Sequence, residues 1–298
     1  MTATDDASSH ARPNEARITH LHWDATLNFD AQTIAATAKL TVHYTTPKLR
    51  LDVKHLAVRS VHCSLMDDSK EEAEAEAVYK FEPLTKEHLG QCMEITLPTG
   101  SEECVVRIVY ETSKDLCSAA QWLPPEQTAG RVYPYFFTQC QAIHARSLVP
   151  CQDCPGVKIT YTASVTVPSW ATCLMSALST GSESSLDERG VGRTTFRFEQ
   201  TVPVPAYLIA VVVGDLESRR ISSRCCIWSE PSVVEAAAFE FSQTEEFLQI
   251  AESLTLPYKW GRYDVLCLPS SFPYGGMENP CLTFVTPTLL AGDKVRFQ

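Results

Sequence analysis

The residues best suited to chemistry in this 298-residue sequence lie near its C-terminal end. Gly275-Gly276-Met277-Glu278-Asn279 follows a turn-forming stretch, residues 270–274, and lies between two runs that are typical of strands. Two adjacent glycines allow the backbone to approach another group closely. Glu278 follows this turn directly, so its carboxylate could bind a cation that lies beside an exposed backbone edge. The free amino end of a peptide offers such a cation. Taken alone, a glutamate after a Gly-Gly turn is more often simply an exposed surface acid.

A second polar cluster, residues 139–144, follows the aromatic run 133–137. On an extended segment Gln139 and Gln141 would point to the same side of the strand. Each side-chain amide offers a donor and an acceptor, so the pair could hold a peptide or a carboxylate. The alternative is a polar strand face without a ligand.

The sequence contains no complete metal or nucleophile motif. His-Glu-x-x-His, Gly-x-Ser-x-Gly and a phosphate-binding glycine loop are all absent. Cys151-Gln152-Asp153-Cys154 has the spacing of a metal or redox pair, but one such pair without a second is a weak zinc signal, and Pro155 follows it. We therefore expect structural thiols there and no metal site in this chain. His20 and His22 share a strand face and are expected at the surface.

Composition excludes several classes of function. The formal net charge is -11 and no lysine or arginine cluster offsets it, so nucleic acid is not an expected partner. Residues 1–17 are polar, without the apolar stretch of a signal peptide, and the longest apolar run, residues 206–213, is too short to span a membrane. Twelve dispersed cysteines in a chain of this length indicate buried, reduced thiols and a cytoplasmic protein.

The elements that position these residues are mostly β and then α+β. Short alternating runs with turn residues between them predict strands up to residue 213, the last at 207–213. After about residue 214 the pattern changes: 231–241 has helical composition, and 263–268 and 281–286 are strand candidates. We predict a disordered tail at 1–17, a β domain at 18–214 and an α+β segment at 215–298.

Three local expectations complete this assignment. Ser242-Gln243-Thr244-Glu245 is a capping box, with the Ser242 hydroxyl as the helix cap and Glu245 reaching back to it. The acidic stretch 67–77 is expected to be a solvated loop or a short helix. Residues 179–192, rich in serine, glycine and charge, are expected to form a hairpin loop.

Gly275-Gly276-Met277-Glu278-Asn279 resembles the exopeptidase signature of the aminopeptidase N-type zinc peptidases. The resemblance extends in order from about residue 18 to Lys294, and is strongest to the branch of the family that also opens a fatty-acid epoxide. The segments that carry it are residues 139–144, 150–153, 207–210, 258–264 and 271–294. Similarity in order over most of the chain makes chance an implausible explanation.

The resemblance implies a saddle-like N-terminal β-sheet domain followed by a thermolysin-like zinc domain that removes N-terminal residues from peptides. It implies that Glu278 binds the substrate ammonium and that Gly275 and Gly276 present backbone groups to an added substrate strand. The remaining substrate-binding positions that it implies are Gln139, Cys140, Gln141, Pro273, Tyr274 and Met277. Peptide amino ends and a fatty-acid epoxide would be the substrates of the full-length enzyme.

The family's zinc ligands should follow Lys294, but the sequence continues only as Val295-Arg296-Phe297-Gln298. We therefore expect an incomplete catalytic domain, no zinc in this chain and no hydrolysis by it. We also expect the strand at 281–290 to lack its covering helices, and residues 215–298 to be loosely held. The alternatives are a short isoform that binds peptides or proteins without catalysis, and an adaptor in which the signature is coincidental.

Overall fold

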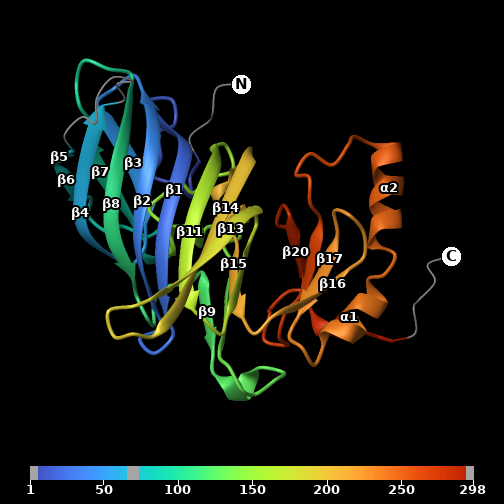
Figure 1. Ribbon diagram of the computed structural model, residues 1–298. Helices are drawn as coiled ribbons and strands as arrows, with labels where there is room; N and C mark the ends of the chain where they lie inside the picture. The colour runs from blue at the N-terminus through green and yellow to red at the C-terminus, as the bar shows by residue number, and fades with distance from the viewer. Residues whose placement is uncertain (1–5, 66–73, 293–298) are drawn as a thin grey trace.

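The computed structural model describes residues 6–65 and 74–292, and these form two lobes. A large β lobe contains β1 to β15, and a smaller α+β lobe begins at β16 (Figure 1). The change of sheet falls between β15, which ends at Gly214, and β16, which begins at Glu217. Mostly β structure followed by α+β structure is confirmed.

The largest sheet of the β lobe has eight strands in the order β13-β14-β11-β1-β2-β8-β4-β5. Along β2 and β11 buried side chains alternate with more exposed ones, so one face packs on the core and the other faces solvent. β1 and β11 pair in parallel and the other neighbours are antiparallel. The strands are β1 (Ala16–Asn28), β2 (Thr33–Tyr44), β4 (Leu56–Leu65), β5 (Ala75–Glu76), β8 (Glu103–Thr112), β11 (Lys158–Pro168), β13 (Leu178–Leu186) and β14 (Gly192–Pro205).

Two smaller sheets complete the β lobe. β3 (Lys48–Val53), β7 (Gln91–Thr96) and β6 (Tyr79–Phe81) form one sheet, in that order. β12 (Thr172–Met175), β15 (Val211–Gly214), β10 (Tyr135–Thr138) and β9 (Ala120–Leu123) form the other, in that order. One large apolar cluster, which includes Trp23, Leu49, Phe136 and Val165, joins all three sheets of this lobe. This continuous core fixes β10, and so the polar residues that follow it.

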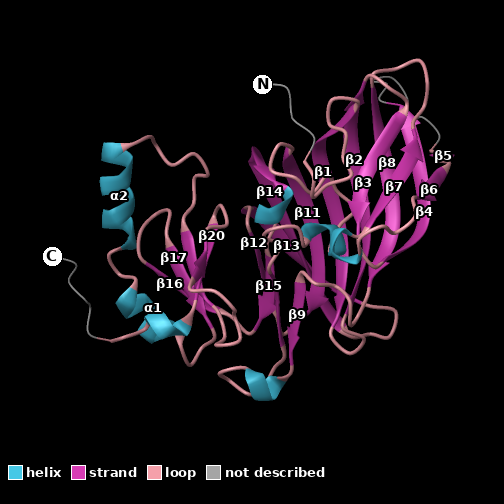
Figure 2. Ribbon diagram, turned by 180° about the vertical axis from the view of Figure 1, so that it is seen from behind, coloured by secondary structure: helices cyan, strands magenta, loops and turns pink. Residues whose placement is uncertain are grey.

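The second lobe is built on a five-stranded sheet with the order β16-β17-β18-β20-β19. Its central strands β17, β18 and β20 are parallel and almost wholly buried, as expected for strands covered on both faces. The elements are β16 (Glu217–Arg220), β17 (Cys226–Ser229), α1 (Val234–Glu240), α2 (Thr244–Leu254), β18 (Asp264–Cys267), β19 (Gly276–Met277) and β20 (Leu282–Val285). The two helices lie on the side of this sheet away from the β lobe (Figure 2).

The two lobes meet through an apolar junction. Tyr135, Phe137 and Val212 from the four-stranded sheet pack with Phe272 and Phe284 of the second lobe, and all are buried. Burial of such side chains stabilises by about 1.5–3 kcal/mol each. A charge-assisted contact adds to this junction: the buried carboxylate of Glu230 accepts hydrogen bonds of 3.0 and 3.1 Å from the amides of Ala129 and Gly130. The lobes are therefore held by both packing and hydrogen bonding.

The predicted disordered tail at 1–17 is wrong for residues 6–17, while residues 1–5 lie outside the described residues. The Ser9 hydroxyl and the His10 amide donate hydrogen bonds of 2.6 and 2.7 Å to the buried Asp52 carboxylate. Ala11 is buried, and β1 begins at Ala16. A polar segment is ordered here because a buried carboxylate needs donors.

The predicted capping box is also wrong. The residue before α2 is Gln243, and no side chain caps the helix. Glu245 instead pairs with Arg224 at 3.0 Å, and Glu252 of the same helix pairs with Arg224 at 2.6 Å. Two carboxylates one to two turns apart bind one guanidinium, and this draws Glu245 away from the helix end. Arg224 thereby lowers the pKa of Glu252 to about 2.

The segment 179–192 is a hairpin, but most of it is strand rather than loop. β13 reaches Leu186, the turn occupies 187–191, and β14 starts at Gly192. Of the acidic stretch 67–77, residues 67–73 lie outside the described residues, and Ala75–Glu76 form the short strand β5. Propensity did not identify β13 because none of its side chains is buried.

The expectation that 281–290 lacks cover is wrong for its strand. Leu282 and Phe284 of β20 are buried in the junction, and Val285 is buried in a third cluster together with Ala237 of α1. Leu289, after the strand, is 45% exposed. Exposed apolar side chains are also found on α2, where Phe247, Ile250 and Leu254 are 58%, 56% and 78% exposed and no residue is buried.

Candidate functional site

The Gly-Gly-Met-Glu-Asn signature forms an edge of the second sheet. β19 pairs antiparallel with β20, with Gly276 opposite Val285 and Met277 opposite Phe284. β19 ends the strand order of this sheet, so its other edge has no strand neighbour among the described residues. A Cβ on Gly276 would lie 3.2 Å from the Phe284 carbonyl oxygen, so the close approach that needs glycine is made within the sheet. An open edge of this kind can accept an added strand.

Glu278 follows this edge with its side chain exposed. The two flanking residues, Met277 and Asn279, are 3% and 4% exposed, so Glu278 is directed away from the core. No hydrogen bond or ion pair joins the Glu278 carboxylate to any described residue. The carboxylate is thus free to bind a cation that comes alongside the edge strand.

Gln139 reaches the signature from the other lobe. It follows β10, and its amide Nε2 donates a hydrogen bond of 3.4 Å to Sδ of Met277. Gln139 Oε1 and Asn279 Nδ2 are both buried without a hydrogen-bond partner among residues 6–65 and 74–292. One unpaired acceptor from the β lobe and one unpaired donor from the second lobe therefore lie near Met277. Buried atoms of this kind are those that a bound polar ligand would satisfy.

Cys140 and Gln141 are arranged differently from the prediction. β10 ends at Thr138, and the chain then turns, with the His144 amide donating to the Cys140 carbonyl at 2.9 Å. Gln139 is buried and Gln141 is exposed, so the two glutamines do not share a strand face. Cys140 is buried, and burial raises the pKa of its thiol well above the usual value, which keeps it protonated.

The turn before the signature is anchored by a residue that the sequence argument did not assign. Phe272 is buried and packs edge-on against Phe137 of β10 and Phe284 of β20, with ring centroids 5.9 Å apart in each case. Pro273 and Tyr274 are exposed on this turn. Asn279 was also not assigned a role, although its place in the signature was a signal that could have identified it. In the sequence, Phe272 is a single aromatic residue between a serine and a proline, and this pattern does not indicate its packing role.

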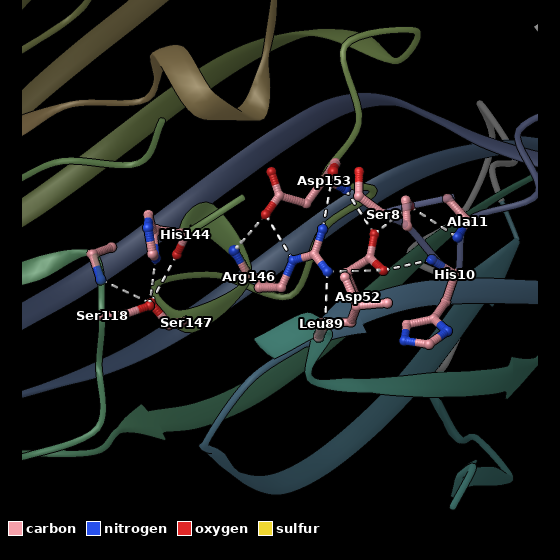
Figure 3. A network of polar contacts seen from close by, with 12 residues as sticks. Ser8, His10, Ala11, Asp52, Leu89, Ser118, His144, Arg146, Ser147 and Asp153 are labelled. Atoms are coloured by element: carbon pink, nitrogen blue, oxygen red, sulfur yellow. Dashed lines mark hydrogen bonds and ion pairs between the residues drawn. The ribbon is translucent and has the colours of Figure 1, made fainter. Parts of the chain in front are cut away.

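A buried polar network holds the segment that carries Gln139 and Cys140 (Figure 3). Arg146 is fully buried, and its Nε donates to Asp153 Oδ2 at 2.9 Å while Nη1 donates to the Leu89 carbonyl at 2.6 Å. Asp52, also fully buried, lies 3.8 Å from Arg146 and accepts from the Asp153 amide at 3.0 Å. Burial raises the pKa of Asp153 to about 6, against the opposing effect of Arg146. This network links the 139–154 segment to β3 and to the N-terminal residues.

The Cys151–Cys154 pair belongs to the same segment. Both thiols are buried and free, like the other cysteines of the chain, as predicted for structural thiols. No three His, Cys, Asp or Glu side chains converge as a metal site in the described part of the chain. The residues present there therefore do not fit a zinc ion. No described helix is long and apolar enough to cross a bilayer.

Comparison with known proteins identifies the family. Residues 17–208 match the Peptidase M1 N-terminal domain, and residues 239–297 match the Peptidase family M1 domain. Leukotriene A-4 hydrolase of Xenopus laevis is 46% identical over 295 residues, which is 97% of this chain and 46% of that protein. Aminopeptidase B of Mus musculus is 39% identical over 307 residues, covering 97% of this chain and 45% of that protein.

Solved structures agree with these sequence matches. Native leukotriene A4 hydrolase from Saccharomyces cerevisiae superimposes with a TM-score of 0.85 at 33% identity, over 99% of this chain and 44% of that one. The chain thus spans less than half the length of these relatives. The matched N-terminal domain alone covers most of the sequence, and the match continues into the lobe that carries the signature. The chain therefore belongs to peptidase family M1.

Proposed function

We propose that this chain is the amino-terminal part of a bifunctional zinc aminopeptidase and leukotriene A-4 epoxide hydrolase, and that its signature binds the amino end of a peptide. The observation that carries the proposal is the position of Glu278: a carboxylate without a partner, beside an open strand edge, at the point where Gln139 of the other lobe contacts Met277. The names of the relatives from Xenopus laevis and Mus musculus support both activities for the full-length protein.

In this proposal a peptide lies along β19 as an added strand, with backbone hydrogen bonds to the edge at Gly275 and Gly276. Its terminal ammonium meets the Glu278 carboxylate, and this requirement for a free amino end restricts the site to N-terminal residues. Gln139 bounds the proposed binding site from the β lobe, and Cys140 and Gln141 follow it in the chain. Pro273, Tyr274 and Met277 form the wall beside the terminal side chain.

We further propose that this chain binds but does not cleave peptides. The described residues contain no side-chain set that fits zinc, and the sequence lacks His-Glu-x-x-His. In the full-length enzyme zinc would supply the activated water. The proposal includes a cytoplasmic location, which twelve buried free thiols support. A binding module that works without catalysis remains the second candidate, favoured by the exposed apolar residues of α2.

Calorimetry with a short peptide and its N-acetylated form tests the binding proposal. We expect heat of binding for the free peptide only, and its loss in Glu278→Gln, with affinity reduced about 10- to 100-fold because one charge-assisted contact is removed. Glu246→Gln is the matched control, since Glu246 is an exposed acid of the same lobe. Equal binding of the acetylated peptide, or unchanged affinity in Glu278→Gln, would contradict the proposal.

Elemental analysis and an aminopeptidase assay on the same sample test the proposal that the chain binds peptides but does not cleave them. We expect less than stoichiometric zinc and no turnover. Stoichiometric zinc together with turnover would contradict the proposal, because this chain would then contain the zinc ligands itself.

A further inference from the structure

The proposed function does not use the hairpin formed by β13 and β14, which lies at one end of the eight-stranded sheet. β13 ends the strand order of the eight-stranded sheet, and among the described strands it pairs only with β14. All nine of its residues are exposed. It carries Ser179, Ser182, Ser184 and Ser185. An extended segment with one free edge and exposed hydroxyls is accessible to an enzyme that modifies side chains.

The residues after Ser185 make it distinct from its neighbours. Asp187 and Glu188 follow it by two and three positions. Kinases that use charge patterns to select substrates read acids at such positions with a basic groove. We propose that Ser185 is a phosphorylation site for an acid-directed serine kinase.

The ion pairs of the structure separate Ser185 from the other candidates. In the described chain four serines have a described acid three residues later, and they are Ser184, Ser185, Ser232 and Ser242. The acids that follow Ser184, Ser232 and Ser242 are Asp187, Glu235 and Glu245, and each is paired with an arginine, at 3.4, 2.6 and 3.0 Å. Glu188, which follows Ser185, is exposed and has no hydrogen bond or ion pair to a described residue. Among the described serines, only Ser185 therefore has an unpaired carboxylate three residues later.

The neighbouring strand, β14, offers a partner for phosphorylated Ser185. Ser185 lies directly across from Arg193 in the β13–β14 register. Side chains at such positions are about 4.5–5.5 Å apart at Cβ. The present contact of Arg193 with Asp187 is long, at 3.4 Å for both Nε and Nη2. A phosphate on Ser185 would offer Arg193 stronger acceptors and tie the end of the hairpin together.

The reaction needs only a nucleoside triphosphate and the kinase. The Ser185 hydroxyl oxygen bonds to the γ-phosphorus, the bond from that phosphorus to the β-phosphate oxygen breaks, and the nucleoside diphosphate leaves. The hydroxyl proton passes to the base of the kinase.

The test incubates the full chain with an acid-directed serine kinase and ATP, followed by intact mass and peptide mapping. We expect a single phosphate on Ser185, none in Ser185→Ala, and an initial rate about tenfold lower in Glu188→Gln. Glu183→Gln is the matched control: Glu183 lies on β13 and is paired with Arg197 at 2.7 Å. Its rate should stay within about twofold of the unsubstituted chain, since the carboxylate of Glu183 is already paired and is not the one that follows Ser185 by three residues.

Amide hydrogen exchange across 182–194 tests the contact with Arg193. Phosphorylation should slow exchange in the unsubstituted chain and leave it unchanged in Arg193→Gln. Phosphate on Ser184 or Ser232, an unaltered rate in Glu188→Gln, or modification of an isolated 178–190 peptide but not of the folded chain would overturn the proposed site. Equal slowing in Arg193→Gln would overturn the role of Arg193.

Discussion

The side-chain amide of Gln139 donates a hydrogen bond of 3.4 Å to the sulfur of Met277, and this contact joins the β lobe to the signature. Neither residue alone defines a site. Their contact places Glu278, the next residue along, at the junction of the lobes rather than on a remote surface. The position of the carboxylate therefore depends on how well the two lobes pack.

Met277→Ala should destabilise the chain. Met277 is 3% exposed and belongs to the apolar junction, so its truncation removes packing from both lobes. We expect a loss of about 2–5 kcal/mol in the free energy of unfolding, measured by chemical denaturation. Tyr274→Ala on the same turn, where the side chain is 49% exposed, is the control and should cost much less. Similar losses in both variants would show that Met277 is not part of the junction core.

Arg146→Met tests the buried network. Removing the guanidinium leaves the carboxylates of Asp52 and Asp153 buried without their cation. Breaking one side of a buried pair costs about 3–5 kcal/mol. Arg59→Met, which removes an exposed pair with Glu111, should cost about 1 kcal/mol or less. Equal unfolding midpoints for Arg146→Met and the unsubstituted chain would contradict this account of the network.

The stability of the folded chain should depend on pH through the ionisation of Asp153. Burial raises the pKa of its carboxyl from 3.8 to about 6 in the folded chain, so between these values the folded state binds more protons than the unfolded state. Its contribution to stability is therefore greatest below pH 3.8 and is lost as the pH rises through about 6. We expect the difference in unfolding free energy between the unsubstituted chain and Asp153→Asn to decrease over this range. A difference that grows with pH would show that the pairing with Arg146 outweighs burial.

Glu230→Gln should weaken the attachment of the lobes to each other. The Glu230 carboxylate accepts from the amides of Ala129 and Gly130 with one oxygen each, and a glutamine side chain can replace only one of these acceptors. We expect a loss of about 1–3 kcal/mol, because the side-chain NH2 of the buried residue 230 would then face a backbone N–H donor without an acceptor. Tryptophan fluorescence and far-UV dichroism should then report unfolding transitions that no longer coincide. If the two transitions coincide and the denaturant concentration at their midpoint is unchanged, this would count against a role of Glu230 in joining the lobes.

Limited proteolysis should cut the second lobe first. α2 has no buried side chain, and the 255–262 stretch after it is also unburied, so this region opens at the lowest cost in free energy. We expect early cleavage within 242–262 and a resistant fragment that ends near residue 214. Cleavage inside the β lobe before any cut beyond residue 214 would contradict the expectation that the β lobe folds on its own.

The sequence predicted what depends on local pattern and on short motifs. Alternating runs predicted the β structure before residue 213, helical composition at 231–241 predicted α1, and the strand candidates at 263–268 and 281–286 contain β18 and β20. The signature and its context indicated the family, which the comparisons confirmed. These features are readable because the periodicity of a strand or helix, and the letters of a motif, are properties of neighbouring residues.

Only the tertiary structure decided how distant residues meet. Asp52 orders the N-terminal segment, Arg224 draws Glu245 from the helix end, and Met277 rather than Gln141 is the partner of Gln139. Each contact joins residues that are far apart in the sequence, so no periodic pattern predicts it. A buried polar atom takes the nearest available partner in space, and the packing of the two lobes decides which partner is near.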